Sequence, residues 1–290
     1  MEIVDAHHHF WDPARNYHPW LRDEPPIPFR YGDYNAIRRR YLHEQYLADT
    51  RGYTVTGSVY VETEWDPRDP IGEMTYVAEL RRKGLPSVAV GQAWLDRADA
   101  GRVLERLTGF DFVRSVRHKP RPGDMQTATR WRKGFALLAK RLGRFDLQTP
   151  WAHLGDAAAL ARDFPSVRIF LNHAGLPADR SPEGIADWRK AMAQLAAEPN
   201  VAVKISGLGI PGVGCTAEAN RQIVLAAVDL FGVERCMFAS NFPVDSLCAS
   251  FDEIYRCFAA IVGDFSDDER HALFAGNARR LYAIPNGAPQ

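Results

Sequence analysis

Apolar and polar positions follow one repeated order along the chain: a short apolar run, then a longer stretch with a single apolar stripe. The short runs have the length of strands, and the longer stretches have the helical period of about 3.6 residues. Alternation of this kind is typical of parallel βα units, and eight units are the number found in a barrel. The predicted strands are Ile3–His9, Gly57–Glu64, Ser87–Leu95, Val113–Lys119, Phe145–Thr149, Val167–His173, Val201–Ser206 and Cys236–Asn241.

The predicted fold is an α/β protein, a single-domain (β/α)8 TIM barrel. Its 290 residues suit one such barrel, which typically needs about 250. Two helical stripes end at glycines, Gly143 and Gly232, and the segments Ser250–Glu253 and Ser266–Glu269 have the sequence of capping boxes that start the last helices. The apolar positions of the two stripes are Trp131, Phe135, Leu138 and Leu142, and Ile223, Val224, Ala227, Val228 and Phe231.

Two segments fall outside this rhythm. Residues 10–34 are rich in Pro, Trp, Tyr, Phe and Arg and show neither the strand nor the helix period. Because they follow the first strand, they would lie at the mouth of the barrel, as a lid over a site or as a loop packed for stability alone. The barrel is expected to occupy residues 1–284, and residues 285–290 to form a flexible tail.

Composition limits the classes of partner. Lys plus Arg and Asp plus Glu number 36 each, so no overall charge attracts the protein to nucleic acid or to an anionic membrane. The N-terminus lacks the pattern of a signal peptide, and no apolar run reaches the roughly 18 residues of a membrane helix. We therefore expect a cytoplasmic protein with a small-molecule partner, either monomeric or a homo-oligomer. The four cysteines have no C-x-x-C spacing and are expected to be reduced.

The strongest chemical signal is the histidine run at the end of the first predicted strand. In an extended strand, His7 and His9 project to one face while His8 projects to the other. Two imidazoles at the C-terminal end of an inward-facing strand can hold a divalent cation or polarise a carbonyl group. The simpler alternative is a surface cluster of histidines without a role in chemistry.

Several motifs in this order resemble a known family. They are I-V-D-A-H-H-H-F-W-D, V-R-S-V-R-H, F-L-N-H-A-G, V-K-I-S-G-L and M-F-A-S-N-F-P-V-D, and they fall on successive predicted strands. Together they resemble the metal-dependent hydrolases called amidohydrolase-related. Within that family the chain is most similar to the lactonase branch, which includes sugar-acid lactonases and the hydrolase of 2-pyrone-4,6-dicarboxylate. The resemblance extends from Glu2 to about Tyr282.

The resemblance implies a set of site residues. The family's H-x-H motif falls on His7 and His9, and its histidine after strand 6 falls on His173. These three would polarise the substrate, either through a divalent metal, zinc above all, or without any metal, because members of this branch differ in this respect. A buried His173 bonded only to the backbone is the simpler alternative.

Arg117 and His118 match the family's strand-4 motif, in which an arginine binds a carboxylate or carbonyl oxygen of the substrate. Only one of them faces inward unless the strand ends there, and an arginine in a surface ion pair is the alternative. Six further polar residues lie at or just after predicted strand ends, and for each a role in the site is weighed against ordinary solvation or packing. They are Glu62, Glu64, Gln92, Gln148, His153 and Lys204.

The chain departs from the family pattern at Asn241. The family usually has Asp there, and that Asp accepts a proton from the attacking water, which an amide cannot do at neutral pH. Asp245, beyond Pro243, could return to the mouth as the base, or it could cap the next helix or be bonded in a turn. Asn241 and Asp245 are therefore both candidate catalytic residues.

The function expected from the resemblance is hydrolysis of a lactone or related cyclic ester. Water would attack a carbonyl group polarised by the histidine cluster or its metal. One alternative is a metal-dependent decarboxylase of an aromatic or muconate-type acid on the same scaffold. Another is a barrel that binds a small molecule without turnover, which Asn241 alone would favour.

Overall fold

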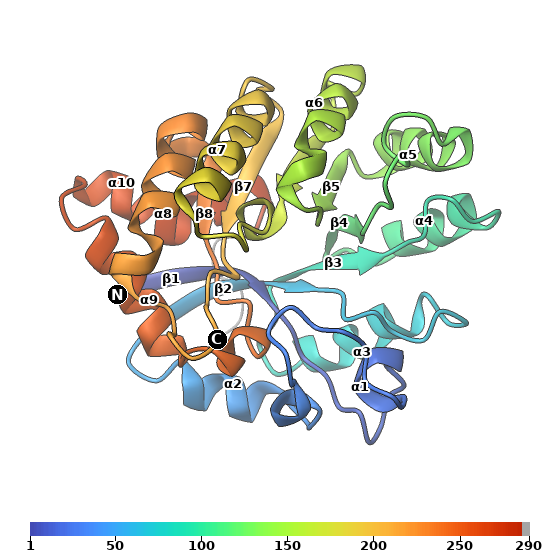
Figure 1. Cartoon of the computed structure of the whole chain (residues 1–290). Coiled ribbons are helices and arrows are strands. Elements are labelled where there is room, and N and C mark those ends of the chain that lie inside the picture. Colours follow the sequence, from blue (N-terminus) through green and yellow to red (C-terminus); the bar gives the residue numbers. More distant parts are fainter. Residues whose placement is uncertain (286–290) are drawn as a thin grey trace.

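The computed structural model describes residues 1–285, and these form eight parallel strands surrounded by helices (Figure 1). The strands are β1 Glu2–His8, β2 Thr54–Val61, β3 Val88–Gln92, β4 Val113–His118, β5 Arg144–Leu147, β6 Arg168–Leu171, β7 Val201–Ile205 and β8 Cys236–Phe238. The helices are α1 Pro19–Arg22, α2 His43–Asp49, α3 Gly72–Arg81, α4 Ala100–Thr108, α5 Thr129–Arg141, α6 Leu154–Asp163, α7 Pro182–Ala196, α8 Ala217–Phe231, α9 Phe251–Ile261, α10 Asp267–His271 and α11 Asn277–Leu281. The predicted (β/α)8 TIM barrel is confirmed.

The strands are paired in sequence order from β1 to β8. The first and last strands, β1 and β8, approach each other at their C-terminal ends. There the amide of His9 donates to the carbonyl of Phe242 at 2.7 Å, and the amide of Asn241 donates to the carbonyl of His7 at 2.8 Å. Asp5 supports this junction, because its carboxylate accepts from the amide and the hydroxyl of Ser240 at 2.9 and 2.6 Å. The sheet thus closes nearly into a barrel at the end that carries the site.

The helices begin and end where the sequence predicts. Both capping boxes are present, since Ser250 and Glu253 bond reciprocally at the start of α9 and Ser266 and Glu269 at the start of α10. Helix α5 ends beside Gly143, whose φ of 61° is readily adopted by glycine. Between α10 and α11 the chain forms one π-helical turn over Ala272–Gly276.

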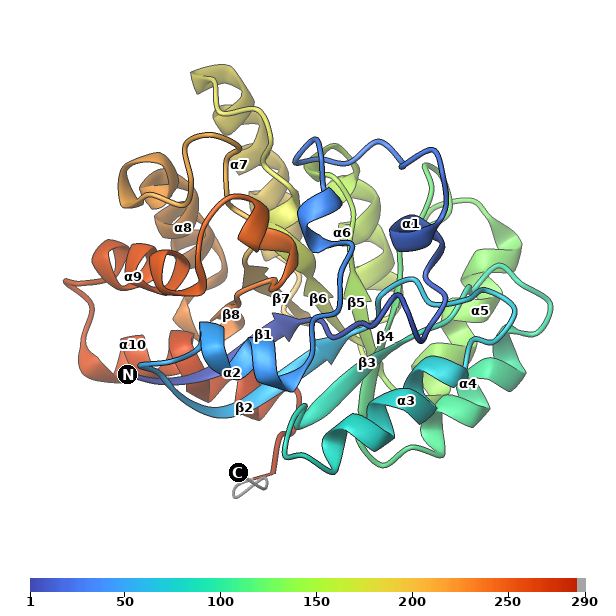
Figure 2. The same cartoon turned by 90° about the horizontal axis from the view of Figure 1, so that it is seen from below.

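The apolar core has two layers. The larger lies between the sheet and the helices, and the smaller fills the inside of the barrel. Tyr282 and Ile284, after α11, belong to the inner layer, so the C-terminal segment closes the barrel at the end opposite the site (Figure 2). The inner layer also contains Val4, Ala6, Val59, Val61, Val88, Val90, Phe170, Ala202, Met237 and Ala239. Because these apolar side chains fill the barrel, the residues at the C-terminal ends of the strands are available for chemistry.

Within residues 1–285, no helix combines the length and the apolar character needed to cross a membrane. In this described part all four cysteines are unpaired, and Cys215, Cys236 and Cys257 are buried. The tail predicted for residues 285–290 lies outside the described residues except for Pro285.

Candidate functional site

The candidate site lies where the strands end. At its C-terminal end each predicted strand extends one to three residues beyond the observed one, and several of these extra residues line a cavity at the mouth of the barrel. Three of them have left-handed backbone conformations, with φ of 54° at Glu64, 55° at His173 and 54° at Asn241. Residues other than glycine rarely adopt such angles, which cost about 1–2 kcal/mol each, and they concentrate at functional sites.

The histidine run has the predicted orientation. A register shift between Asp5 and His8 interrupts the pairing of β1 with β2, and bulges of this kind redirect side chains next to active sites. The His7 ring lies 5.0 Å from that of His9 and 4.6 Å from that of His173, measured between centroids. His8 faces the other way and bonds Ser58 Oγ at 3.0 Å. The structure therefore brings the three predicted histidines together.

Hydrogen bonds fix the protonation of one ring. His9 Nδ1 lies 2.8 Å from the carbonyl oxygen of Val61, which can only accept, so Nδ1 carries the proton and Nε2 of the neutral ring does not. His173 Nδ1 bonds Ser206 Oγ at 2.9 Å. Both ring nitrogens of His7 are buried, and residues 1–285 offer them no hydrogen-bond partner.

All three imidazoles are neutral near pH 7. Burial is the main cause that lowers the pKa of His7 and His9, followed by the charge of Lys204 for His7 and of Arg117 for His9. Burial and then the Arg30 charge lower the pKa of His173. A neutral ring in this cluster can accept a proton from a reacting group.

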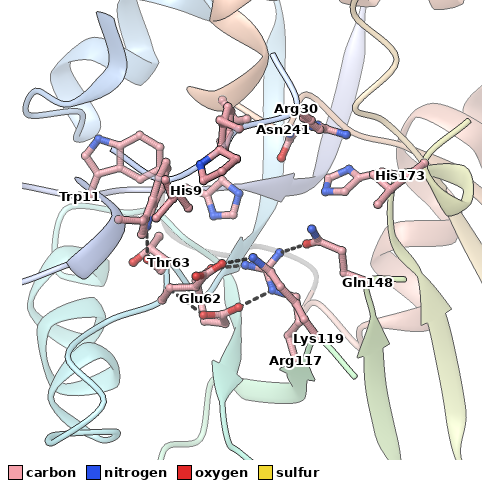
Figure 3. Close-up of a pocket in the computed structure, with 17 residues that line it drawn as sticks. His9, Trp11, Arg30, Glu62, Thr63, Arg117, Lys119, Gln148, His173 and Asn241 are labelled. Atoms are coloured by element: carbon pink, nitrogen blue, oxygen red, sulfur yellow. Dashed lines mark hydrogen bonds and ion pairs between the residues drawn. The ribbon is translucent and has the colours of Figure 1, made fainter. Parts of the chain in front are cut away.

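Arg117 points into the same cavity and is held in place. Its Nε donates to Glu62 Oε1, its Nη2 to the Glu62 carbonyl at 2.6 Å, and its Nη1 to Gln148 Oε1 at 3.0 Å (Figure 3). The two charged side chains are only 5% and 2% exposed. These bonds leave N–H groups of both terminal nitrogens for a ligand, and the buried guanidinium is oriented before the ligand arrives.

Asp245 lies behind Asn241. The Asn241 amide donates to Asp245 Oδ1 at 2.6 Å, and the same oxygen accepts from Tyr31 at 3.0 Å and faces Arg30 Nη2 at 3.4 Å. Burial raises the pKa of Asp245, although Arg30 and these donors oppose that effect. Asn241 therefore lines the cavity, while Asp245 does not line it and binds the side-chain amide of Asn241.

Gly207, after β7, is required for this arrangement. A Cβ atom built there would lie 2.8 Å from the Arg30 guanidinium and 2.9 Å from His173 Nδ1, and its φ is 65°. Any side chain at this position would therefore displace a group of the site.

The segment between β1 and α2 forms one wall. Trp20, Phe29 and Arg30 line the cavity, and the Trp20 indole donates to the Thr63 carbonyl at 2.8 Å, which ties the segment to the end of β2. Trp20 and Phe29 stack with their ring centroids 5.8 Å apart. We call this space of about 290 Å³ the main cavity; its further lining residues include His9, Trp11, Glu62, Glu64, Arg117, Lys119, Gln148, His173 and Asn241 (Figure 3).

Other predicted residues lie elsewhere. His118 Nδ1 accepts from the Leu95 amide at 3.2 Å and the Trp131 indole at 3.0 Å, so its ring is bound to the helix side. Gln92 and His118 line a neighbouring cavity, and His153 ends a short 3-10 turn after β5.

Lys204, predicted to bind substrate, is fully buried inside the barrel. Its ammonium lies 2.6 Å from Asp146 Oδ1 and 4.8 Å from the centre of the Tyr282 ring. The pairing with Asp146 and the aromatic face offsets the cost of burying the charge. In this position Lys204 acts on the histidines through its charge and does not reach the main cavity.

The donor set does not fit a resident divalent cation. Among residues 1–285, no three His, Cys, Asp or Glu side chains are grouped to hold one metal ion. His9 and His173 each bond the protein through Nδ1, which leaves only Nε2 of each ring for a ligand, and Asn241 supplies no negative charge. The cations Arg117 and Lys204, which lower the pKa of the imidazoles, also disfavour a dication beside them.

Sequence reasoning missed Arg30 and Lys119, which line the main cavity, and Ser206, which orients His173. The aromatic segment gave a signal for the wall as a whole, but nothing in its pattern distinguishes Arg30 from the arginines around it.

Comparisons with known proteins find relatives along nearly the whole chain. The Amidohydrolase family model matches residues 4–284. The chain is 40% identical to the protein y4mH of Sinorhizobium fredii, over 98% of this chain and 99% of that protein. It is 29% identical to an L-fucono-1,5-lactonase of Burkholderia multivorans, over 98% and 97%.

Among solved structures, an amidohydrolase from Burkholderia multivorans superposes with a TM-score of 0.81 at 27% identity, covering 98% of this chain and all of that one. One crystal form of that protein contains HEPES and another contains zinc. The resemblance seen in the motifs is thus confirmed over nearly the whole length. The chain belongs to the amidohydrolase family of (β/α)8-barrel hydrolases.

Proposed function

We propose that this hydrolase opens the ring of a sugar-acid lactone. One observation carries the proposal: the unprotonated nitrogen of a neutral histidine, His9, and a buried, tethered guanidinium, Arg117, border the same cavity. Acyl hydrolysis needs an acceptor for the proton of water and a donor for the charge that develops on the carbonyl oxygen. His9 and Arg117 supply these two functions.

The reaction follows from these groups. A water molecule gives a proton to His9 Nε2 as its oxygen bonds to the lactone carbonyl carbon. Negative charge on the carbonyl oxygen is stabilised by the remaining N–H groups of Arg117. The ring C–O bond then breaks, and His9 gives the proton that it received from water to the departing oxygen. The product is the open hydroxy acid. Charge on the intermediate favours the protonated imidazole, which opposes the depressed pKa of His9.

The remaining cavity suits a polyhydroxy ring. Its volume of about 290 Å³ is close to the lower end of the range for small-molecule sites, about 300–1,000 Å³. Gln148, with its oxygen held by Arg117, keeps its amide hydrogens for a hydroxyl group, and Trp20 and Phe29 provide a flat apolar wall. The similarity to a relative named L-fucono-1,5-lactonase supports a sugar acid over other lactones.

Asp245 is proposed as a positioning residue and His9 as the base. One carboxylate oxygen of Asp245 receives the Asn241 amide and the Tyr31 hydroxyl, and the residue is 2% exposed. The bond from Asn241 sets the direction of that side chain, and the contact with Arg30 Nη2 at 3.4 Å sets the direction of the guanidinium. The substitution of Asp by Asn at position 241 is then compatible with catalysis.

The reaction proposed here uses only side chains of the chain itself. Treatment with a chelator is therefore expected to leave the rate within twofold, and added zinc is not expected to raise it. Metal content measured by mass spectrometry on the same sample checks that the chelated protein is free of zinc. A rate lost on chelation and restored by zinc would contradict this mechanism.

A turnover screen tests the function. Sugar-acid 1,5- and 1,4-lactones are incubated with the protein, and ring-opened acid is measured by NMR above the spontaneous rate. A decarboxylase would instead release carbon dioxide from aromatic or muconate-type acids, and a silent binding barrel would bind lactones without turnover. Either result, with no ring-opened acid, would refute the proposal. His9→Ala is the control, since it should abolish acid formation if the reaction occurs in this cavity.

A further inference from the structure

A second cavity adjoins the main one. It has a volume of about 340 Å³ and lies at the C-terminal ends of β2, β3 and β4. The two cavities share four lining residues: Glu62, Glu64, Arg117 and Lys119. We call the second space the side cavity. None of its remaining lining residues takes part in the reaction described above.

The side cavity is lined by aromatic and proline side chains and by one buried amide group. Trp65 and Trp94, both half-buried, line it together with Pro19 and Pro67. Gln92 ends β3 and is only 9% exposed, yet its Oε1 has no hydrogen-bond partner among residues 1–285. A buried acceptor without a donor is costly, and a ligand that donates a hydrogen bond there would remove the cost.

The charges of the side cavity are already paired. Arg117 is bound to Glu62, and Lys119 forms an ion pair with Glu64. An anionic or cationic ligand would have to displace one of these partners. A neutral ligand with hydroxyl donors and apolar faces fits better, because hydroxyl groups can reach Gln92 while indole rings cover the faces.

The partition between the two cavities is weak. It includes the Glu64–Lys119 pair, whose side chains are 39% and 41% exposed. An exposed pair of this kind contributes little to the stability of a protein. One ligand can therefore extend from the main cavity into the side cavity by displacing these two partly exposed side chains.

We propose that the side cavity is a second sugar subsite, and that the substrate is a lactone carrying a further glycosyl residue. The lactone ring occupies the main cavity, and the glycosyl residue lies against Trp65 and Trp94 with a hydroxyl group donating to Gln92. This inference rests on the proposed function for the lactone half only. It adds a class of substrate, the lactones of disaccharide acids.

The test compares two substrates in two variants. Cellobiono-1,5-lactone carries a glycosyl residue, and glucono-1,5-lactone does not. Trp94→Ala is expected to lower kcat/KM for the first by about tenfold and to leave it within twofold for the second, because only the extended substrate uses the indole face. Trp94→Phe, the matched control, keeps an aromatic face and should retain most of the activity.

Two results would overturn the inference while leaving lactone hydrolysis intact. The first is a wild-type kcat/KM for cellobiono-1,5-lactone below that for glucono-1,5-lactone. The second is an equal loss for both substrates in Trp94→Ala, which would make Trp94 a purely structural residue.

If neither lactone is opened, the proposed function fails, and binding still decides the subsite. Cellobiose is then titrated into the protein while the heat of binding is recorded by calorimetry. Saturable binding that is lost in Trp94→Ala and kept in Trp94→Phe supports the subsite, and the absence of binding to the wild type refutes it.

Discussion

Glu73, on α3, is a buried carboxyl group whose protonation should change the stability of the barrel near neutral pH. Its Oε1 accepts from the Thr63 amide at 2.7 Å, the Thr63 hydroxyl at 2.8 Å and the Tyr60 hydroxyl at 2.9 Å. Its Oε2 has no partner among residues 1–285, and the side chain is 1% exposed. Burial, and then the charge of Glu62, raise its pKa to about 7.

The size and sign of the effect follow from this pKa. The ordinary value is 4.5, so between pH 4.5 and 7 the folded state binds more protons at Glu73 than the unfolded state does. The free energy of unfolding therefore falls as pH rises through this window. With about 1.36 kcal/mol for each unit of pKa, the loss is about 3 kcal/mol.

Glu73→Gln removes the titration and keeps an oxygen for the three donors. Urea unfolding of both proteins at pH 5 and pH 8 gives the difference in stability at each pH. Between pH 5 and pH 8 the wild type loses about 2.5 kcal/mol of this contribution, so the free energy of unfolding of Glu73→Gln relative to the wild type should be about 2.5 kcal/mol higher at pH 8 than at pH 5. The cost of an unpartnered amide group is the same at both pH values and cancels.

Other groups also titrate, but they do so in both proteins. Burial lowers the pKa of His8 to about 3 and that of His18 to about 4, so their contribution to stability is lost as pH falls below 6.5. Glu79→Gln, at an exposed glutamate of the same helix, is the matched control and should change the free energy of unfolding by no more than about 0.5 kcal/mol. An equal stability difference for Glu73→Gln at pH 5 and pH 8 would refute the reasoning.

Three further predictions concern the main cavity. Arg117→Lys should raise KM and lower kcat/KM by about 100-fold, since an ammonium cannot make the three bonds to Glu62 and Gln148 and still reach the substrate; unchanged steady-state behaviour would exclude this role. Replacing His7 and His9 together by Ala should abolish lactone opening and change the free energy of unfolding by less than about 2 kcal/mol, as measured in urea, and surviving activity would exclude the site. Asp245→Asn should raise KM and slow turnover by less than about tenfold, because Arg30 loses its charged partner. If turnover instead falls by about two to four orders of magnitude, as after loss of a general base, and the acidic limb of the pH–rate profile disappears, Asp245 is the base.

The alternation of apolar runs and amphipathic stripes was sufficient to predict all eight strands, because each strand packs on both faces. The strand ends were harder to place. From the sequence, Glu64, His173 and Asn241 are the last residues of predicted strands. In the structure their backbones have left-handed conformations, which the spacing of apolar residues does not reveal. The direction of a side chain at the mouth depends on these turns and on the bulge in β1.

Lys204 and Asp245 illustrate a second limit. Both are polar residues near strand ends, and sequence position alone places both at the mouth. The structure pairs Lys204 with Asp146 inside the barrel and puts Asp245 behind Asn241. These partners are distant in the sequence or depend on a turn, so only the folded chain reveals them.

The central claim is that the main cavity opens a sugar lactone with His9 as base. The most direct measurement is the initial rate of acid release from L-fucono-1,5-lactone by chelated protein of known metal content, above the spontaneous rate in buffer. Sustained turnover is expected from the wild type, and no rate above that of buffer from His9→Ala. A wild-type rate equal to that in buffer, or full activity in His9→Ala, would contradict the claim.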